Sequence, residues 1–473
     1  MNRRHEGLPQ EWLRGEIAVV GLGRSGAGAA LLLARAGASV YASDGAAGDA
    51  PRRAAERLTA AGIAAEAGRH DLERIARAAV VVASPGVPPG AAPLATARQA
   101  RVPIVSEVEV ALRVMHGPRI IAVTGTNGKT TTTALTGHVL RALGHDAVDA
   151  GNIGTAVSEI ALRDRPPAWL ALEMSSFQLH DTPSIAPAVG VVTNLAPDHL
   201  DRYESVEDYY GDKALIFRNA SATSLWVLNG DDPLTLALPQ RRPGALAAGG
   251  LPGHTYRFSL RDAAVEAHYD RAAGQLVLRG SPLLARDRLH LLGDHNVANA
   301  LAAVLAVSVA DEAHSTPEAR EHVAEGLRTF RALDHRLEPV GEFGGVLWIN
   351  DSKATNVSST LVAIEGMTRP TVVLLGGRHK GEPYTALGRA LRRAAKRVLA
   401  YGEAGELIAD DLRHLVPVER LGSDFGEVME RARSIAEPGD AVLLSPACSS
   451  YDMFRNYEER GAEFRRLAAR GTA

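Results

Sequence analysis

The run Gly-Thr-Asn-Gly-Lys-Thr-Thr at positions 125–131 has the composition of a phosphate-binding loop. It follows the apolar run Ile121–Val123 and opens a segment with apolar residues at helical spacing. A turn between a strand and a helix presents backbone N–H groups to an anion, while Lys129 adds a positive charge and Thr130 a hydroxyl ligand for Mg²⁺. Val123 stands where the usual loop has its first glycine, so the sequence predicts a shorter variant. A strand–turn–helix junction without a ligand is the alternative.

A second glycine turn lies near the N-terminus, where Gly21, Gly23 and Gly26 follow the apolar run Ile17–Val20. Asp44 ends the next expected strand, at the distance typical of nicotinamide-dinucleotide motifs. The pattern requires only that a diphosphate lies over a helix N-terminus and that a carboxylate reaches a ribose or a base. A nicotinamide cofactor and a nucleotide-sugar diphosphate both meet this requirement, and a tight turn without a ligand is the third possibility.

Polar residues follow two other expected strands of the phosphate-loop region. Glu173 ends the buried run Trp169–Leu172, where an acid that organises Mg²⁺ is expected, and a carboxylate that caps the next helix is the alternative. His199 follows the run Val189–Val192 and is flanked by aspartates, which is consistent with a metal ligand, although a lone histidine is usually structural.

Two expected helices carry residues whose role the pattern leaves open. Lys213 lies in the run Asp208–Phe217, where the pattern alone favours a surface lysine. Asn296 and Asn299 lie at the start of an apolar helix that follows Gly293. Asn296 can cap the helix, and Asn299, at the same helix end, can bind a base; the spacing does not decide between a cap and a ligand.

The elements that must position these residues form three segments of repeated strand–turn–helix units, which predicts parallel sheets covered by helices. The second segment starts at Arg119 and the third near Leu333. In the third segment a polar turn follows each strand, and we expect these turns to share one edge of the sheet. Its strands are expected at 346–349, 371–375, 397–400 and 441–444. From about Pro239 to Asp287 the pattern predicts an antiparallel excursion of short strands.

The composition limits the classes of function. At 473 residues the chain is too long for one hydrophobic core, and about three domains are expected. A net charge of −3 without a basic cluster argues against a nucleic-acid partner. No run approaches the roughly 20 apolar residues that a membrane span needs, and no signal-peptide pattern is present. Cys448 is the single cysteine, so no intrachain disulfide can form. We therefore expect a soluble, cytoplasmic protein with no membrane partner.

Taken together, these motifs resemble those of the Mur ligases, the ATP-dependent enzymes that form amide bonds in peptidoglycan precursor synthesis. The resemblance covers almost the whole chain and includes further runs at Gly151–Gly154, Asp334–Arg336 and Asp351–Asn356. The first glycine turn and the run Leu444–Gly461 are typical of the glutamate-adding members of the family.

The resemblance implies an α/β fold of three domains. A Rossmann-like N-terminal domain at 1–117 would bind the UDP-sugar, a central phosphate-loop ATPase domain with a parallel sheet at 118–333 would bind ATP, and a C-terminal Rossmann-like domain at 334–473 would bind the amino acid. The implied reaction joins glutamate to UDP-N-acetylmuramoyl-L-alanine (UDP-MurNAc-L-Ala) through an acyl phosphate, and D-glutamate is the expected isomer. The implied cofactors are ATP and two Mg²⁺ ions, with a carbamylated Lys213, and the enzyme would be a monomer that binds only small molecules.

The resemblance also implies a role for each residue that matches the family motifs. The catalytic residues would be Lys129, Asn152, His199, Lys213 and Arg336. The residues around ATP would be Gly125, Thr126, Asn127, Gly128, Lys129, Thr130, Thr131, Asn296, Asn299, Arg336 and Asp351. The residues around the UDP-sugar would be Gly23, Arg24, Ser25, Gly26, Asp44, Ser84, Gly86, Asn152 and Gln178. The amino acid would contact Lys353, Thr355, Lys380, Ser450 and Tyr457. The metal ligands would be Thr130, Glu173, His199 and Lys213.

The chain departs from the family at two of these positions. Relatives often have Asp-Thr-Arg where this chain has Asp44-Gly45-Ala46, so some polar contacts to the nucleotide must differ. Tyr457 stands where relatives often have phenylalanine.

Other functions remain open at this point. A nicotinamide-dependent oxidoreductase would use the first glycine turn but leaves the Lys129 loop unexplained. A non-catalytic regulator could use ATP as a switch. Folylpolyglutamate synthetase shares the phosphate loop but neither the first glycine turn nor the run Ser445–Gly461. Within the ligases, the sequence does not decide between D- and L-glutamate.

Overall fold

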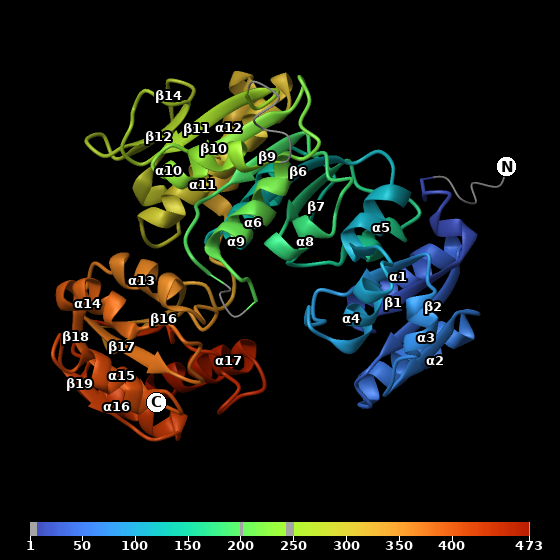
Figure 1. The fold of residues 1–473 in the computed structure, drawn as a ribbon. Coiled ribbons are helices and arrows are strands. Elements are labelled where there is room, and N and C mark those ends of the chain that lie inside the picture. The colour runs from blue at the N-terminus through green and yellow to red at the C-terminus, as the bar shows by residue number, and fades with distance from the viewer. Residues whose placement is uncertain (1–6, 199–201, 243–249, 473) are drawn as a thin grey trace. The chain divides into compact units, whose positions relative to one another are not determined.

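The computed structural model describes residues 7–198, 202–242 and 250–472. The chain divides into two compact units, one made of Met1–Ala285 and Ala298–Leu327 and the other of Arg286–Val297 and Arg328–Ala473. The described residues form three sheets, two in the first unit and one in the second, each flanked by helices (Figure 1). The predicted α/β architecture with three domains is therefore confirmed, and the exact domain boundaries stay a prediction.

The N-terminal sheet is entirely parallel, with the strand order β3-β2-β1-β4-β5. Apolar residues of α1, α2 and α5 pack against one face, and those of α3 and α4 against the other. The carboxyl ends of β1 and β2 therefore carry the first glycine turn and Asp44 side by side. The elements are β1 (Glu16–Val20), α1 (Arg24–Arg35), β2 (Ser39–Asp44), α2 (Asp49–Ala60), β3 (Ala64–Ala67), α3 (Leu72–Ala76), β4 (Val80–Ala83), α4 (Ala92–Gln99), β5 (Ile104–Ser106) and α5 (Glu107–Val114).

The central sheet has nine strands in the order β14-β13-β12-β11-β10-β9-β6-β8-β7. Strands β10, β9, β6, β8 and β7 are neighbours in this order and run parallel. The phosphate loop after β6 therefore lies between the ends of β8 and β9. The first elements are β6 (Arg119–Thr124), α6 (Lys129–Ala142), β7 (Ala147–Gly151), α7 (Val157–Ala161), β8 (Trp169–Glu173), α8 (Ser176–His180), β9 (Val189–Val192), α9 (Val206–Ala214), β10 (Leu225–Asn229) and α10 (Pro233–Ala237). They are followed by β11 (His254–Ser259), β12 (Ala267–Asp270), β13 (Gln275–Leu278), β14 (Ser281–Ala285), α11 (Asp294–Ala310) and α12 (Pro317–Thr329).

The antiparallel excursion predicted for 239–287 is only partly correct. β11 pairs parallel with β10, and β12 pairs parallel with β11. Only β12, β13 and β14 form antiparallel pairs. The chain between β10 and β11 is long enough to cross back and start a parallel strand, whereas a short turn joins β13 to β14 and allows only an antiparallel pair. Strand pattern alone did not separate these two kinds of connection.

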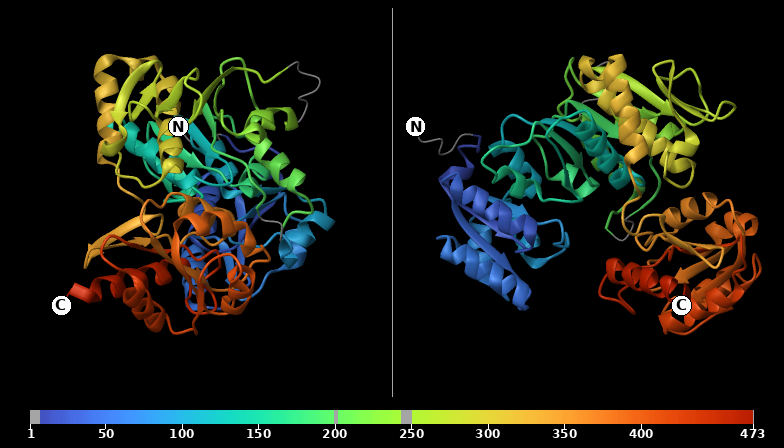
Figure 2. Two further views of the ribbon diagram at one scale, coloured as in Figure 1. Left: turned by 90° about the vertical axis from the view of Figure 1, so that its left-hand side faces the viewer. Right: turned by 180° about the vertical axis from the view of Figure 1, so that it is seen from behind.

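The third sheet has the order β15-β16-β20-β17-β18-β19, with β15 antiparallel to its neighbour and the others parallel. Helices α13, α14 and α15 cover one face, and α16 and α17 cover the other (Figure 2). All four strands expected in this segment are confirmed. The elements are β15 (Glu338–Phe343), β16 (Val346–Asn350), α13 (Val357–Glu365), β17 (Thr371–Gly376), α14 (Gly388–Ala394), β18 (Ala395–Tyr401), α15 (Gly405–Leu412), β19 (Val418–Arg420), α16 (Phe425–Ile435), β20 (Ala441–Leu444) and α17 (Tyr457–Ala468).

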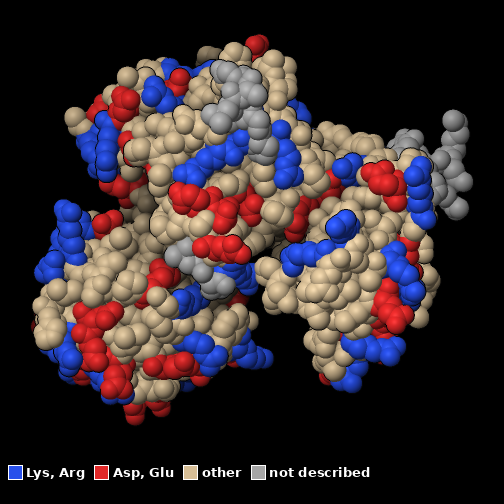
Figure 3. All heavy atoms as spheres, viewed as in Figure 1, with Lys and Arg blue, Asp and Glu red and all other residues tan. Residues whose placement is uncertain are grey.

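Lys and Arg side chains are interspersed with Asp and Glu over the face seen in Figure 3, in keeping with the net charge of −3. Among the described residues, no helix is long and apolar enough to cross a membrane.

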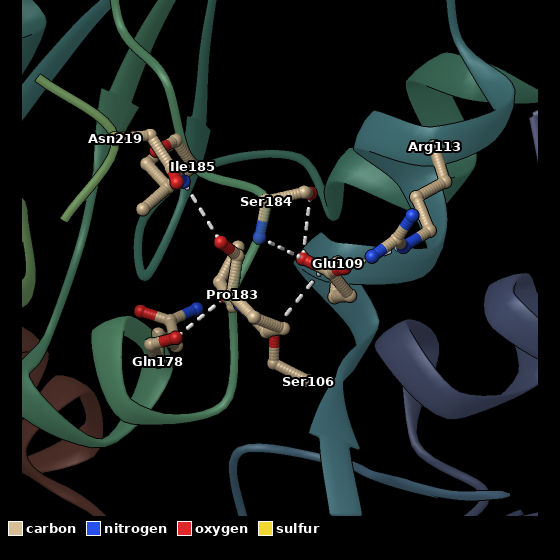
Figure 4. Close-up of polar contacts among 9 residues, drawn as sticks. Ser106, Glu109, Arg113, Gln178, Pro183, Ser184, Ile185 and Asn219 are labelled. Carbon is tan, nitrogen blue, oxygen red and sulfur yellow. Dashed lines mark hydrogen bonds and ion pairs between the residues drawn. The ribbon is translucent and has the colours of Figure 1, made fainter. Parts of the chain in front are cut away.

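Buried polar contacts join α5 of the N-terminal domain to the segment that follows α8 of the central domain (Figure 4). The Ser106 hydroxyl caps α5 and lies 2.7 Å from the Thr182 hydroxyl. Glu109 is fully buried, and its Oε2 accepts hydrogen bonds from the backbone N–H and hydroxyl of Ser184 at 2.9 and 2.7 Å. Its Oε1 accepts from Arg113 Nε at 2.5 Å. These contacts fix the start of α5 against the domain that carries the phosphate loop.

We expect Glu109→Ala to lower the free energy of the first unfolding transition by about 2–4 kcal/mol, because it leaves the half-buried Ser184 N–H and Arg113 guanidinium without their buried acceptor. Urea unfolding followed by circular dichroism measures the change. Glu73→Ala is the control, since the Glu73 side chain is 87% exposed and its ion pair with Arg77 spans 3.8 Å, so it should cost no more than about 0.5 kcal/mol. Equal effects of the two substitutions would contradict the role given to Glu109.

Candidate active site

The phosphate loop connects β6 to α6 through two glycines with positive φ, Gly125 at 140° and Gly128 at 81°. A Cβ on Gly125 would lie 2.0 Å from Thr193 Oγ1, and one on Gly128 would lie 2.3 Å from Asn299 Oδ1. Both positions therefore need glycine for backbone conformation and for space. The loop opens directly into α6, so its N–H groups and the helix N-terminus have the arrangement that binds phosphate.

Residues at the end of β9 hold this loop in shape. Asn194 Oδ1 accepts from the backbone N–H of Asn127 at 2.9 Å, and Asn194 Nδ2 donates to the Asn127 carbonyl at 2.9 Å. Thr193 Oγ1 donates to the same carbonyl at 2.6 Å. This role of Thr193 and Asn194 was not predicted from the sequence, where the segment after β9 indicated only possible metal ligands. A polar Thr-Asn pair directly after a buried strand of the same sheet was the available signal.

Two lysine side chains meet at one carbonyl of the loop. Lys129 Nζ donates to the carbonyls of Gly125 and Thr126 at 3.0 and 2.7 Å. Lys213 Nζ, on α9, donates to the Gly125 carbonyl at 2.6 Å. The expectation of a surface lysine from the helix pattern is wrong, because Lys213 is only 1% exposed. Burial, and secondly the nearby charge of Lys129, hold the pKa of Lys213 well below its usual value, which favours an uncharged amine.

Glu173 ends β8 beside the loop and is 1% exposed. Its Oε1 accepts from Asn152 Nδ2 at 3.1 Å, while Oε2 has no hydrogen-bond partner among the described residues. A buried carboxylate oxygen without a donor is costly unless a cation binds it, so this atom fits a Mg²⁺ ligand. Thr130, at the start of α6, is 5% exposed, and its hydroxyl offers a second oxygen. In the described part of the chain no three His, Cys, Asp or Glu side chains group as a metal site, and Mg²⁺ bound mainly by nucleotide phosphates needs none.

The two asparagines of α11 have different surroundings. Asn299 is 6% exposed, and its Oδ1 accepts from Thr132 Oγ1 of α6 at 3.3 Å. It therefore lies against the phosphate-loop helix. Asn296 Nδ2 donates to the Leu292 carbonyl at 2.8 Å, so its side chain is bound to the turn before its own helix. Another predicted residue, His199, lies outside the described residues.

A cavity of about 470 Å³ lies at the carboxyl ends of β1, β2 and β4. The predicted UDP-sugar residues that line it are Gly23, Arg24, Ser25, Asp44, Ser84 and Gly86. Gly26 is not among them; a Cβ there would lie 1.8 Å from the Gly21 carbonyl oxygen, so this glycine allows α1 to pack against the turn. The Asp44 carboxylate accepts from the backbone N–H groups of Leu22 and Ala46 at 2.7 and 2.9 Å, which holds the two turns together.

A second cleft of about 670 Å³ adjoins this cavity, because Ser84 lines both. Asn152 and Gln178 of the central domain lie on its other side. Gln178 is 3% exposed; its Oε1 accepts from the N–H and hydroxyl of Ser175 at 3.0 and 3.1 Å. Its Nε2 has no hydrogen-bond partner among the described residues, so a donor is available at the cleft. The structure thus brings all but one of the predicted UDP-sugar residues to two adjoining cavities.

In the second unit, Asp351 follows β16 and is 7% exposed. It accepts from the Leu337 N–H at 3.1 Å and from the Ser445 hydroxyl at 2.8 Å. Burial raises the pKa of Asp351 to about 7. Its hydrogen bonds link the turn after β16 to the turn after β20 and to the segment that follows Arg336.

The predicted amino-acid residues form two close pairs and one single position. Lys353 Nζ lies 5.2 Å from the centre of the Tyr457 ring, and Lys380 Nζ donates to Thr355 Oγ1 at 3.2 Å. Ser450 lies in the turn after β20 and is 3% exposed. The expectation that the polar turns of this sheet share one edge is confirmed. Strands β16, β20, β17 and β18 run parallel, and Arg378 Nε after β17 donates to Glu403 after β18 at 3.0 Å.

Arg460 on α17 connects these turns and was not singled out from the sequence. It is fully buried, and its guanidinium donates to Ser352 Oγ at 3.0 Å and to the carbonyls of Ser352, Cys448 and Gly376 at 2.8–3.4 Å. All three turns therefore depend on the same side chain, that of Arg460. The Cys448 thiol in the same place is buried, its pKa is raised to about 11 by burial, and it lies 2.9 Å from the Tyr384 hydroxyl.

We expect Thr193→Val to weaken ATP binding roughly three- to tenfold, because the Asn127 carbonyl loses a short hydrogen bond and the loop loses rigidity. Isothermal titration calorimetry with ATP measures the dissociation constant. Thr223→Val is the matched control, since Thr223 is exposed, and it should bind ATP as the unchanged protein does. Unchanged affinity in Thr193→Val would remove the role given to the β9 end.

Comparison with known proteins agrees with this geometry. Three family descriptions match in chain order: the MurD-like N-terminal domain of Mur ligases at residues 15–106, the Mur ligase middle domain at 123–307 and the glutamate ligase domain of Mur ligases at 335–448. The chain is 40% identical to a UDP-N-acetylmuramoylalanine–D-glutamate ligase of Salinibacter ruber, over 97% of this chain and 98% of that protein. It is 42% identical to the protein of the same name from Anaeromyxobacter dehalogenans, over 96% and 97% of the two chains.

Solved structures support the fold alone. The UDP-N-acetylmuramate–alanine ligase of Thermotoga maritima is similar with a TM-score of 0.59 and 21% identity, covering 96% of this chain and all of that one. A pseudomurein peptide ligase of Methanothermus fervidus is similar with a TM-score of 0.56 and 18% identity, covering 96% and 99% of the two chains. The phosphate loop, the paired cavities and the three matching domains lead to one conclusion: the chain belongs to the Mur ligase family and is an ATP-dependent amide ligase.

Proposed function

We propose that this enzyme joins D-glutamate to the L-alanyl carboxylate of UDP-MurNAc-L-Ala at the expense of ATP. The observation that carries the proposal is the position of Asn152, which lines the cleft that continues from the sugar-nucleotide cavity and also donates to Glu173 beside the phosphate loop. A carboxylate extending from a sugar nucleotide along this cleft would approach the terminal phosphate of ATP. The name shared by the relatives that are about 40% identical supports the choice of substrates.

The reaction must activate a carboxylate, which resists attack because it is anionic and lacks a leaving group. An oxygen of the alanyl carboxylate attacks the γ-phosphorus of ATP, the bond to the β-phosphate oxygen breaks, and ADP leaves. The amine of glutamate then attacks the acyl carbon, loses a proton and expels inorganic phosphate. Two anions meet in the first step, so the site must supply positive charge.

The residues of the first unit supply that charge and the orientation. Lys129 would turn from the loop carbonyls to the β- and γ-phosphates, and Asn152 would orient the alanyl carboxylate. Mg²⁺ held by Thr130 and Glu173, and a second ion held by His199 and a carbamylated Lys213, would neutralise the phosphates when bound. Asn299 and Asn296 are proposed to bind the nucleotide, and Gln178 Nε2 to donate to the sugar nucleotide.

The residues of the second unit would bind the acceptor. Lys353 and Lys380 carry the charges that a dicarboxylate requires, and Thr355, Ser450 and Tyr457 would complete the contacts. Arg336 and Asp351 are proposed to act on ATP. We propose that the enzyme acts as a monomer in the cytoplasm, where ATP and nucleotide sugars are supplied.

The test of this function is the release of phosphate from ATP in the presence of UDP-MurNAc-L-Ala and either D- or L-glutamate, with mass spectrometry of the product. We expect a product with D-glutamate and essentially none with L-glutamate.

Lys129→Ala should retain its fold by circular dichroism and lose turnover by at least about 10³-fold, because the positive charge of Lys129 that would contact the transferred phosphoryl group is lost. Near-normal turnover of Lys129→Ala, or a preference for L-glutamate, would overturn the respective part of the proposal. Saturable NAD binding to the first glycine turn would instead favour an oxidoreductase.

We further expect Lys213 to carry a carbamate. A buried, uncharged amine can attack CO₂, forming the N–C bond and releasing one proton, and the product is a carboxylate-like metal ligand. Protein equilibrated with ¹³C-bicarbonate should give a carbamate resonance in ¹³C NMR that is missing in Lys213→Met. Lys396→Met is the control and should keep the resonance. Hydrogen bonds to Asp440 and Glu437 raise the pKa of Lys396, which favours the charged ammonium over the amine that reacts with CO₂. A resonance that persists in Lys213→Met would contradict the assignment.

A further inference from the structure

The sugar-nucleotide cavity contains a histidine to which no role has been given. His70 follows β3 and lines the cavity of about 470 Å³ together with Asp44 and Gly45. Its Nδ1 lies 2.9 Å from the hydroxyl of Ser43, which is fully buried. This contact fixes the imidazole ring, so that only Nε2 remains for a ligand. In the described part of the chain no protein group is hydrogen-bonded to Nε2.

The backbone beside His70 leaves room for its ring. A Cβ on Gly45 would lie 3.1 Å from His70 Nε2 and 3.6 Å from Cδ2, and the contact with Nε2 would be tighter than nine in ten real Cβ contacts. Gly45 does not have a positive φ, so backbone conformation does not demand glycine there. The absence of a side chain at Gly45 therefore serves the position of the imidazole. The next two residues, Ala46 and Ala47, also lack polar side chains.

The order of the strands places His70 at the far end of the cavity from the phosphate-binding turn. The sheet runs β3-β2-β1, with the glycine turn after β1, Asp44 at the end of β2 and His70 after β3. Neighbouring strands lie about 4.8 Å apart. A nucleotide whose diphosphate lies at the N-terminus of α1 would cross β2 with its ribose and reach β3 with its base.

The charge of His70 favours a neutral partner over a phosphate. Burial lowers the pKa of His70, although the charges of Asp44 and Glu66 oppose the shift, and this favours the uncharged ring. The Asp44 carboxylate is already bound to two backbone N–H groups. His70 Nε2, which has no hydrogen-bond partner in the described part of the chain, is a further polar side-chain atom at this end of the cavity that is open to a base. A neutral imidazole can accept from a ring N–H or donate to a ring carbonyl, and uracil has both.

We propose that His70 recognises the uracil ring of the sugar nucleotide by a hydrogen bond from or to Nε2, and that Gly45 is required to leave this atom exposed. The inference rests on the proposed function, because that function supplies the uridine nucleotide. His70 determines base recognition and takes no part in the bond-forming steps.

The test measures binding of UDP-MurNAc-L-Ala and of UMP by calorimetry for the unchanged protein, His70→Ala and Gly45→Ala. Loss of one hydrogen bond should raise both dissociation constants roughly three- to tenfold, with turnover at saturating sugar nucleotide and the KM values for ATP and glutamate unchanged. Gly48→Ala is the matched control. It lies in the same loop with φ −70°, and its Cβ would meet only Pro51 Cδ at 3.9 Å, so binding should be unaffected.

A double-mutant cycle separates the proposed role of Gly45 from a direct clash with the ligand. If Gly45→Ala acts by displacing the imidazole, it should have no further effect in the His70→Ala background. Additive effects would overturn the role of Gly45. Binding of ribose 5-phosphate, which lacks the base, should be the same with and without His70.

The outcomes also separate this inference from the proposed function. If the unchanged protein ligates UDP-MurNAc-L-Ala and His70→Ala does so with the same KM and the same affinity for UMP, only the role of His70 is overturned. If the unchanged protein binds no uridine nucleotide, the proposed function itself fails. A similar rise in the KM values of all three substrates would mean that His70 is merely structural.

Discussion

The geometry of the first unit depends on the Gly125 carbonyl, which accepts hydrogen bonds from two lysine side chains. Two ammonium groups at one oxygen would repel each other, and the fully enclosed Lys213 relieves this repulsion by favouring its neutral form. The same contact ties α9 to the phosphate loop, while Thr193 and Asn194 tie the loop to β9. The loop is thereby held from both sides before any phosphate binds, which lowers the ordering cost of binding.

In the second unit, one buried guanidinium holds several turns in place. Carbonyls in or beside the turns after β16, β17 and β20 all accept hydrogen bonds from Arg460, which has no carboxylate among its hydrogen-bond partners in the described part of the chain. A buried cation without a carboxylate is stable only because every N–H of the guanidinium is bonded. Its unneutralised charge also raises the potential beneath the turns that carry Lys353, Lys380 and Ser450. That field would favour an anionic acceptor.

Much of the fold followed from the sequence, because buried parallel strands are runs of apolar residues that end in polar turns. The phosphate loop and the first glycine turn were recognised for the same reason. Contacts between distant segments were not predictable. Lys213 looked like a surface residue because its burial depends on the loop 88 positions away. Arg460 and His70 were overlooked because isolated residues carry no local pattern, and β11 was misjudged because its partner is chosen by the path of the connecting chain.

The enclosed Cys448 has a practical consequence for spectroscopy. With its thiol buried and its pKa raised, it should react slowly with maleimides and other alkylating reagents near neutral pH. Because the chain has no other cysteine, one introduced at an exposed position in each compact unit would be labelled selectively with a fluorophore. Energy transfer between two such dyes could then follow the distance between the units during turnover, without first removing a native thiol.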